Sequence, residues 1–401
     1  MAQRELQRLV DTLAERLGRS VVLDDPEVNL LVASRHFGDA DEQRVRAVLQ
    51  RDVGGPAIGH ILAQGVARWT APGVIPARPD LGMDSRLCHP VRWQGRLLGL
   101  LLVIDADESI TEPERQEVVR TGRELAVLLL GEALGQDRLR GETEAVVADL
   151  LGTDRPRRDA AVSALDRLGV LRVAGQVTVT VVEPTPEPGV LDPTEIEPAL
   201  RIATASVARS RSGRATGVVL GGRGVLLETW DRPPGTERLR EQAAALRDVV
   251  HRVLGTDGSA SAAGVGRPYQ GPGEAYRSYD GALVALRAAR RVAALDGLAL
   301  AAELGPLDVV LRVPASELTT ALVPEPLLAL RAADPHGRLL ATLRSYLEHG
   351  GSAPATAAAL HLHRTSLYYR LERIEQVTGV DLADGRVRLT LHLGLCVLDV
   401  L

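Results

Sequence analysis

The most constraining feature of this 401-residue sequence is a series of three short helical patterns near its C-terminus. They span residues 339–349, 355–360 and 364–377, and Gly379 stops the third. Helices this short, joined by turns of three or four residues, cross at a steep angle and need small side chains where they touch. The run Ala357-Ala358-Ala359 supplies such side chains, so the sequence predicts a helix-turn-helix unit.

The third of these helices has two chemically different faces. Leu367, Leu371 and Ile374 recur at spacings of four and three, which predicts a back buried against the other helices. Short polar side chains in the first turn can reach base edges, and Arg and Tyr can contact phosphates. The candidate DNA-binding residues are His363, Arg364, Thr365, Ser366, Tyr369, Arg370 and Arg373. A plain three-helix bundle with a solvated polar face is the alternative, because residues 338–380 hold five Arg against three acidic residues, an excess of only two.

Residues 356–395 closely resemble the C-terminal helix-turn-helix of the PucR and CdaR family of bacterial regulators. The matching positions are Thr356-Ala357, Leu360, His363, Leu367, Tyr369-Arg370-Leu371, Ile374, Gly379, Asp381-Leu382 and residues 389–395. Thr365-Ser366 stand where the family usually has Asn-Thr, so hydroxyls replace an amide and an Asn-to-adenine contact is lost. The resemblance implies double-stranded DNA as the partner.

The N-terminal part of the chain alternates between helical and strand patterns. Residues 18–131 resemble a GAF-type sensor domain, on the basis of the opening VVLDDPEVNLLVAS, the hairpin CHPVRWQGRLLGLLLVID and a closing helix. We expect a small-molecule effector in this domain, as family members often respond to metabolites. The expected helices are 1–17, 40–49 and 111–152, and the expected strands are 21–23, 30–33, 86–91 and 96–104.

The middle of the chain resembles the GGDEF-like domain of CdaR-type proteins. The expected helices are 155–169, 237–254 and 273–295, the strands are 173–183, 216–220 and 225–229, and the Pro-rich segment 184–198 is expected to loop out. In an active diguanylate cyclase a hairpin carries acidic residues for metal and nucleotide. Here the hairpin at 217–229 has Gly221-Gly222 followed by Arg223 and no carboxylate pair, so we expect no enzymatic activity and no cofactor.

Two possible ligand sites, one for phosphate and one for a metal, are explained better by ordinary structural roles of the same residues. Residues 221–224 could cradle a phosphate, but a hairpin turn between apolar strands fits better, and residues 264–268 are expected to be a loop before a helix. His361, His363, His392 and Cys396 could suggest a metal, but a helix cap, an exposed turn and two packed side chains account for them, so no metal is expected.

Composition limits the remaining possibilities. The chain is 45% hydrophobic and 25% charged, which is typical of several folded domains, and no segment is apolar enough to span a membrane. Only Cys88 and Cys396 are present and no secretory leader is evident, so we expect a cytoplasmic protein. Aromatic residues make up 2%, which disfavours stacking on RNA or single strands, and the net charge of −5 excludes a uniformly basic coat.

Together these features predict a multidomain α+β fold with a GAF-like antiparallel sheet domain, a GGDEF-like α/β domain and an all-α helix-turn-helix domain. The expected parts are a GAF-like domain at 1–131, a helical linker at 132–154, a degenerate GGDEF-like domain at 155–312, a linker at 313–337 and the helix-turn-helix domain at 338–401. We expect a homodimer on two-fold operators, built from the 111–152 tract or the 389–401 helix. The alternative is a non-enzymatic signalling protein that binds a nucleotide or another protein instead of DNA.

Overall fold

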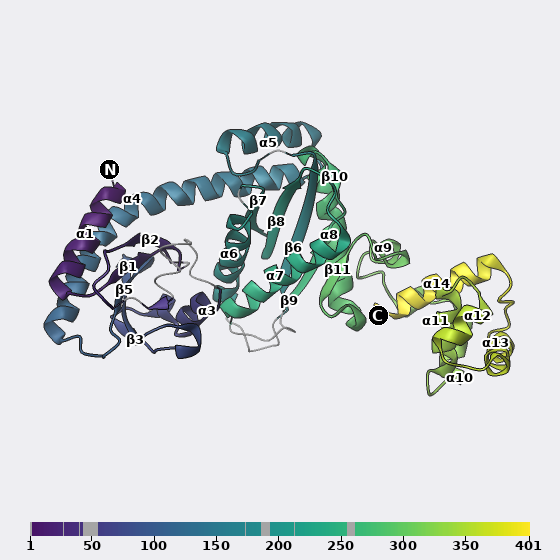
Figure 1. Cartoon of the computed structure of the whole chain (residues 1–401). Helices are drawn as coiled ribbons and strands as arrows, with labels where there is room; N and C mark the ends of the chain where they lie inside the picture. Colours follow the sequence, from purple (N-terminus) through teal and green to yellow (C-terminus); the bar gives the residue numbers. More distant parts are fainter. Residues whose placement is uncertain are drawn as a thin grey trace.

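A computed structural model of the chain describes residues 2–26, 28–39, 41–42, 55–172, 174–185, 193–211, 213–254 and 261–401. Two sheets with their helices lie side by side, and a cluster of short helices follows them at the C-terminal end (Figure 1). This arrangement confirms the multidomain α+β class. The helix expected at 40–49 lies almost entirely outside the described residues, and no described helix is long and apolar enough to cross a membrane.

The N-terminal sheet is antiparallel, with strand order β2-β1-β5-β4-β3. Its elements are α1 (Ala2–Leu17), β1 (Val21–Asp24), β2 (Leu30–Ala33), α3 (Gly55–Ala63), β3 (Gly73–Ile75), β4 (Arg86–Trp93) and β5 (Arg96–Ile104). Alternate side chains of the strands enter two cores, because neighbouring residues of a strand point to opposite faces. On one face Leu23 and Leu101 pack with Leu6 of α1, and on the other Leu100 packs with Ile61 of α3. The expected 86–104 hairpin is confirmed.

A single helix, α4 (Glu112–Leu151), joins the two sheet domains. It begins with a capping box in which the backbone N–H of Thr111 donates to Glu114 Oε2 at 2.7 Å. Its first half buries Val118 and Leu125 in the N-terminal core, and its last turns bury Val147 and Leu150 in the next core. The helix expected at 111–152 is therefore confirmed, and the two domains are connected by continuous helix.

The middle sheet has strand order β11-β9-β6-β8-β7, with β10 beside β6. Among the strand pairs that the structure describes in this domain, only β11–β9 is parallel. α6 and α7 cover one face through Leu200 and Leu246, whereas α8 covers the other through Ala285, and α5 packs against the end of α4. The elements are α5 (Arg155–Leu168), β6 (Gln176–Pro184), α6 (Pro193–Arg209), β7 (Ala215–Leu220), β8 (Arg223–Trp230), α7 (Thr236–Leu254), β9 (Ser261–Val265), β10 (Tyr269–Gln270), α8 (Ala275–Arg291) and β11 (Leu298–Leu300).

Two sequence-based expectations for the middle domain were wrong. The segment 184–198 was expected to loop out, but its last part is the first turn and a half of α6, which Pro193 can begin without losing a hydrogen bond. The segment 264–268 was expected to be a loop, but Gly264 and Val265 complete the fully buried strand β9, and only residues 266–268 lack regular structure. A Cβ at Gly264 would lie 2.2 Å from the carbonyl oxygen of Ala282, so the missing side chain lets α8 approach the sheet.

The C-terminal part is entirely helical. It contains α9 (Pro306–Val310), α10 (Glu325–Ala333), α11 (Arg338–Glu348), α12 (Ala353–Ala359), α13 (Arg364–Thr378) and α14 (Gly385–Leu398). The three helices expected at 339–349, 355–360 and 364–377 are confirmed as α11, α12 and α13. Within the expected linker 313–337, α10 packs against α13 and buries Leu327 and Leu330 completely. The packed helical unit thus includes α10.

Candidate functional site

The turn between α12 and α13 fixes the angle at which the two helices meet. His361 adopts a left-handed conformation with φ of 52°, and the backbone N–H of Leu362 donates to the carbonyl oxygen of Ala357 at 2.9 Å. His363 Nδ1 accepts a hydrogen bond from the backbone N–H of Thr365 at 3.4 Å, which caps α13. His361 is exposed, as expected for a turn residue.

The buried residue of α12 is Thr356, and it is not one of the three alanines expected at the crossing with α13. Ala358 and Ala359 are exposed, Ala357 is half-buried, and Thr356 is fully buried. The hydroxyl of Thr356 donates to the carbonyl oxygen of Ser352 at 2.8 Å, which satisfies its polar group inside the unit. The prediction of three contacting alanines was therefore wrong for Ala358 and Ala359, because they lie on the outer side of this short helix.

The back of α13 is packed as the spacing predicted. Leu367 and Ile374 are completely buried and Leu371 is 8% exposed. Gly379 ends the helix with φ of 69°, and the Glu375 carboxylate accepts from the backbone N–H of Leu382 at 2.9 Å in the following turn. The helix is thus held from behind and at both ends.

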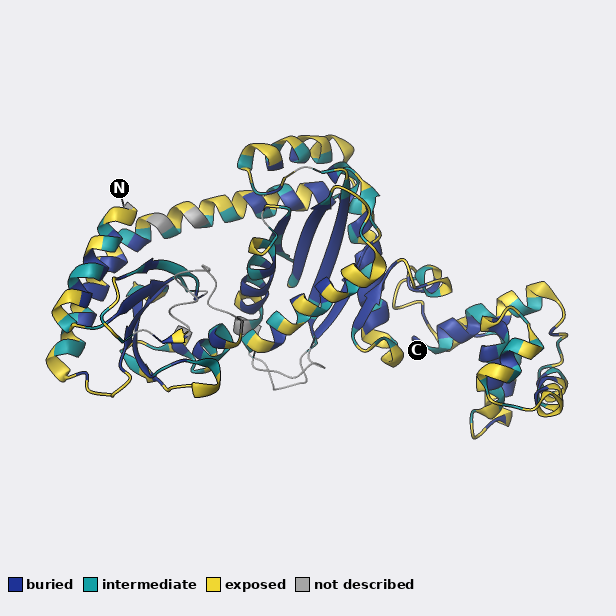
Figure 2. Ribbon diagram, viewed as in Figure 1, coloured by how far each residue is buried: buried dark blue, intermediate teal, exposed yellow. Residues whose placement is uncertain are grey.

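The front of α13 is open to solvent, and exposed residues line the outer sides of the C-terminal helices (Figure 2). Six of the seven candidate residues are exposed: His363, Arg364, Thr365, Ser366, Tyr369 and Arg373. Tyr369 is 71% exposed, which is unusual for an aromatic side chain without a partner surface. This edge of α13 is therefore accessible from solvent.

Tyr368 was missed by the sequence analysis. It is 46% exposed, and the Arg364 guanidinium carbon lies 5.3 Å from the centroid of its ring. The spacing of four residues on a helix was the available signal, since it places Arg364 and Tyr368 side by side. The stacked pair extends the polar edge around the first turn of α13.

Arg370 is placed differently from the other candidates. It is half-buried, and its Nη1 donates to Thr342 Oγ1 of α11 at 3.2 Å. Thr342 is completely buried, so this hydrogen bond ties α13 to α11 inside the unit. Its guanidinium therefore contributes to the packing of the unit.

Arg344 is likewise engaged within the protein. Its two terminal nitrogens pair with the Asp399 carboxylate at 2.8 and 2.6 Å, and these hydrogen bonds raise the pKa of the guanidinium. The pair joins α11 to the end of α14. On α13 itself, the exposed arginines are Arg364 and Arg373.

The hairpin of the middle domain has no acidic residue at its tip. Gly221 and Gly222 have φ of 57° and 77°, and Leu220 faces Arg223, which makes a two-residue turn and confirms the hairpin interpretation. Glu183, at the end of β6, pairs with Arg290 at 2.8 Å and lies 3.6 Å from Arg223 Nε. Across the described ranges, no group of three or more His, Cys, Asp or Glu side chains could hold a metal ion.

One carboxylate of the middle domain is buried in the sheet. Glu228 on β8 is 2% exposed, and its Oε1 lies 3.5 Å from Arg211 Nε. Burial raises the pKa of Glu228 to about 7, and the charges of Arg211 and Arg238 oppose that rise. This group therefore titrates near neutral pH.

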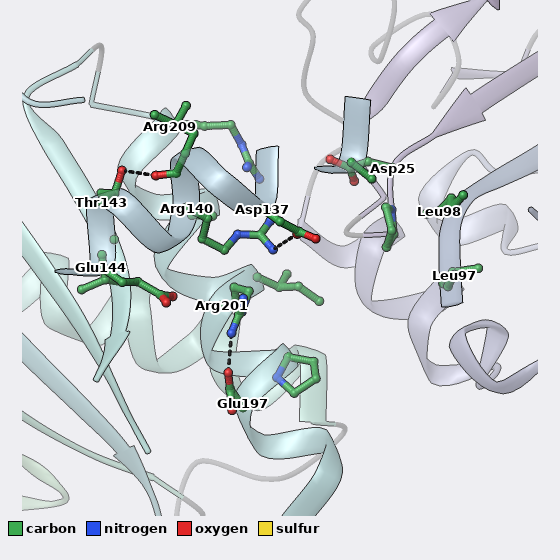
Figure 3. A pocket seen from close by; sticks show the side chains of 18 of the residues that line it. Asp25, Leu97, Leu98, Asp137, Arg140, Thr143, Glu144, Glu197, Arg201 and Arg209 are labelled. Carbon is green, nitrogen blue, oxygen red and sulfur yellow. Dashed lines mark hydrogen bonds and ion pairs between the residues drawn. The ribbon is translucent and has the colours of Figure 1, made fainter. Parts of the chain in front are cut away.

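A cleft of about 910 Å³ lies between the N-terminal and middle domains. Leu97 and Leu98 of β5 line one side, α6 lines the other, and α4 passes beside both (Figure 3). Charged side chains at its rim pair with protein groups: Arg96 with Asp137 at 2.5 Å, and Arg209 with Asn29 of the opposite domain at 2.7 Å. The volume is that of a small-molecule site, although the expected location was inside the N-terminal sheet domain.

Two curated proteins are similar to limited parts of the chain. The carbohydrate diacid regulator of Escherichia coli (strain K12) is 41% identical over 70 residues, which are 18% of this chain and 18% of that protein. An uncharacterized protein in the pkwA 5' region of Thermomonospora curvata is 46% identical over 57 residues, 14% of this chain and 32% of the relative. The chain thus spans less than a third of either relative.

A solved structure is also similar to the chain. The regulator of polyketide synthase expression from Bifidobacterium adolescentis is 19% identical, with a TM-score of 0.30. The match covers 64% of this chain and 91% of that one.

Two family models match two separate parts of the chain, both of which follow the N-terminal sheet domain. Residues 339–397 match the PucR C-terminal helix-turn-helix domain, and residues 152–288 match a GGDEF-like domain. The first match includes α11 to α13 and nearly all of α14, and the second includes the sheet from β6 to β9. These matches confirm the resemblance stated from the sequence: the chain carries a GGDEF-like domain followed by a helix-turn-helix domain of the PucR type.

Proposed function

We propose that this chain is a transcription regulator of the PucR/CdaR type that binds double-stranded DNA through the helix at 364–377. The observation that carries the proposal is the two-sided character of α13. Its back is buried through Leu367 and Ile374, while Thr365, Tyr369 and Arg373 face solvent. A helix held in this way presents its first turns to the major groove, and Arg and Tyr reach the backbone on either side.

The name of the E. coli relative supports the same assignment, since that protein is called a regulator. The middle domain fits a non-enzymatic role in such a protein. Its hairpin carries Arg223 where a cyclase needs carboxylates, and Glu183 beside it is paired with arginines. We infer that the domain transmits or senses a signal and does not catalyse phosphoryl transfer.

The proposed regulator acts as a cytoplasmic homodimer and responds to a small molecule. One helix-turn-helix covers few base pairs, so two copies on a two-fold operator give the contact area that specific binding needs. For the effector, the 910 Å³ cleft is the best-formed candidate, because it combines apolar walls with charged side chains at its rim. We therefore propose the effector site at the junction of the GAF-like and GGDEF-like domains.

DNA binding is tested by selecting duplexes from a random library and measuring fluorescence anisotropy at two salt concentrations. Tyr369→Ala and Arg373→Ala should each weaken binding about 5- to 100-fold, since one good contact is worth about 1–3 kcal/mol. Circular dichroism should be unchanged because both side chains are exposed. Arg331→Ala on α10 is the matched control, as it removes an exposed Arg outside α13.

The competing function is a signalling protein that binds a nucleotide or another protein through the same helices. Salt-weakened, sequence-selective binding that Tyr369→Ala removes favours the regulator. Absence of any selected duplex, together with nucleotide binding to the middle domain, would favour the competitor. Native mass spectrometry of the purified protein reports the bound small molecule and the number of chains in one measurement.

A further inference from the structure

The stretch of α4 between the two sheet domains has one continuous solvent-facing side. Figure 2 shows this middle part of the helix exposed where neither domain covers it. The exposed positions follow one another at spacings of four and three, which places them on a single face. They are Arg120, Glu124, Val127, Gly131, Leu134, Arg138, Glu142 and Ala145, and we call them the outer face of α4.

The centre of the outer face is apolar. Val127 is 59% exposed and Leu134 is 58% exposed, and they lie seven residues apart. Gly131 lies between them, and Gly135 follows on the same side. A Cβ added at either glycine would have no heavy atom within 4 Å. Large apolar side chains beside open backbone form a shallow hollow that a second helix can fill closely.

The charges of the outer face are arranged symmetrically about Gly131. Glu124 lies seven residues before this glycine and Arg138 lies seven after it. Arg120 lies eleven before it and Glu142 lies eleven after it. At each distance from the centre, the two ends of the face therefore carry opposite charges.

We propose that the outer face of α4 pairs with the same face of a second copy in antiparallel orientation, with the two-fold axis at Gly131. This inference rests on the homodimer of the proposed function and specifies its interface. Antiparallel pairing sets Glu124 against Arg138, and Arg120 against Glu142, of opposite chains. It also sets Val127 against the open backbone at Gly135.

Charge complementarity selects this orientation over the parallel one. A parallel pair in register would set each charge against its own copy, so that Glu124 meets Glu124 and Arg138 meets Arg138. In the single chain Arg138 pairs with Glu142 at 2.9 Å and Arg120 pairs with Glu117. These pairs are exposed, and exposed pairs contribute little, so exchanging them across an interface costs little.

The length of the face suits a helix pair. From residue 120 to residue 145 it extends about 38 Å, at a rise of about 1.5 Å per residue. The helix at 389–401, which the sequence also suggested as a dimer interface, is seen as α14, and it packs within its own chain. Its Leu391, Leu395 and Val397 are buried within the C-terminal unit, which leaves Leu389 as its large exposed apolar residue.

The orientation is tested by disulfide trapping with two variants of the full chain that each add one cysteine, Glu124→Cys and Arg138→Cys. The two positions lie about 21 Å apart along one helix, so they cannot bond within a chain. Mixing the variants under mild oxidation should give a covalent dimer, and each variant alone should remain monomeric on a non-reducing gel. Cys88 and Cys396 are buried, so the parent protein supplies the background.

Each alternative result overturns the proposal in a recognisable way. Self-crosslinking of each variant alone would show a parallel pair. A dimer in light scattering that neither variant nor the mixture can trap would show another interface. A monomer at all concentrations would remove the homodimer as well, whereas the anisotropy measurement on DNA reports separately on the regulator assignment.

A charge-reversal series gives a second readout. Glu124→Arg should raise the dimer dissociation constant at least 10-fold at low salt, and Glu124→Arg combined with Arg138→Glu should restore it. Glu241→Arg on α7 is the matched control, because it reverses an exposed helical Glu away from the outer face. Equal effects of Glu124→Arg and Glu241→Arg would contradict the proposed contact.

Discussion

The C-terminal helical unit exposes charged side chains on α13, whereas the middle sheet domain encloses or pairs two of its carboxylates. On α13 most polar residues, among them Thr365 and Arg373, face solvent, whereas Leu367, Leu371 and Ile374 are buried. In the middle domain Glu228 is enclosed in the sheet beside Arg211, and Glu183 at the hairpin is paired with Arg290. Both regions match family models, but these two carboxylates of the middle domain are engaged within the protein, whereas Arg364 and Arg373 of α13 are exposed.

This difference indicates at which positions a substitution can change binding without changing the free energy of unfolding. An exposed group can be replaced with little effect on folding, because water already solvates it. A buried group contributes to stability through its desolvation and its pairing, so its replacement changes folding first. Three tests of this difference follow, beginning with the one expected to have the largest effect.

Leu367→Ala should destabilise the C-terminal unit by about 2–5 kcal/mol, because it leaves a cavity at a completely buried position behind the exposed face. Hydrogen exchange followed by mass spectrometry should show lost protection in α11 to α14, with the middle sheet unchanged. DNA binding should fall with it. Tyr369→Ala, on the opposite side of the same helix, should lose DNA binding while protection stays intact, and equal protection losses in the two variants would break the comparison.

Glu228→Gln should remove a pH dependence from the stability of the middle domain. Because the folded pKa is raised from 4.5 to about 7, the folded chain keeps a proton that the unfolded chain has lost. Stability from this group is fully present below pH 4.5 and is lost as pH rises through 7, a cost on the order of 3 kcal/mol by pH 8.

Denaturant unfolding of Glu228→Gln and the parent at pH 5 and pH 8 measures that cost. The variant should gain stability relative to the parent at pH 8, and the gain should be smaller at pH 5. A variant that loses more at pH 8 than at pH 5 would show that the ion pair with Arg211 outweighs burial. The charged form of Glu228 would then be stabilised inside the sheet, and burial alone would not distinguish the middle domain from α13.

Arg370→Ala and Arg373→Ala sharpen the comparison within one helix, and these effects are the smallest. Arg370 donates to the buried Thr342, so its loss should lower the melting temperature, at a cost of about 1–2 kcal/mol. Arg373 contacts Gln376 at 3.4 Å on the exposed side, so its loss should leave the melting temperature within error and weaken DNA binding alone. Identical melting temperatures would remove the distinction drawn for Arg370.

The sequence predicted most accurately the elements with strong local signals. The helix 364–377 has an apolar face of period 3.6 and a terminal Gly379, and both signals act within the segment itself. The hairpins at 86–104 and 216–229 were equally visible, because turn residues separate two apolar runs.

Tertiary packing decided the elements that were missed. β9 contains Ala262, Ala263 and Gly264, which carry no strand preference, and it becomes a central strand because α8 needs small residues beneath it. α6 begins with prolines that usually mark a loop. Within the site, seven polar residues were named from one pattern, but only contacts across helices show that Arg370 turns toward Thr342.

The length of α4 has a geometric consequence for the two sheet domains. Because 40 residues run as one helix between the sheets, the rotation of one domain about the other is set by the number of residues in that rod. Each residue added near Gly131 turns the far domain by about 100° and moves it about 1.5 Å, so a seven-residue insertion nearly restores the angle while a single residue does not. Because α3 of the N-terminal domain also packs against α7 of the middle domain, a change of that angle would separate these two helices.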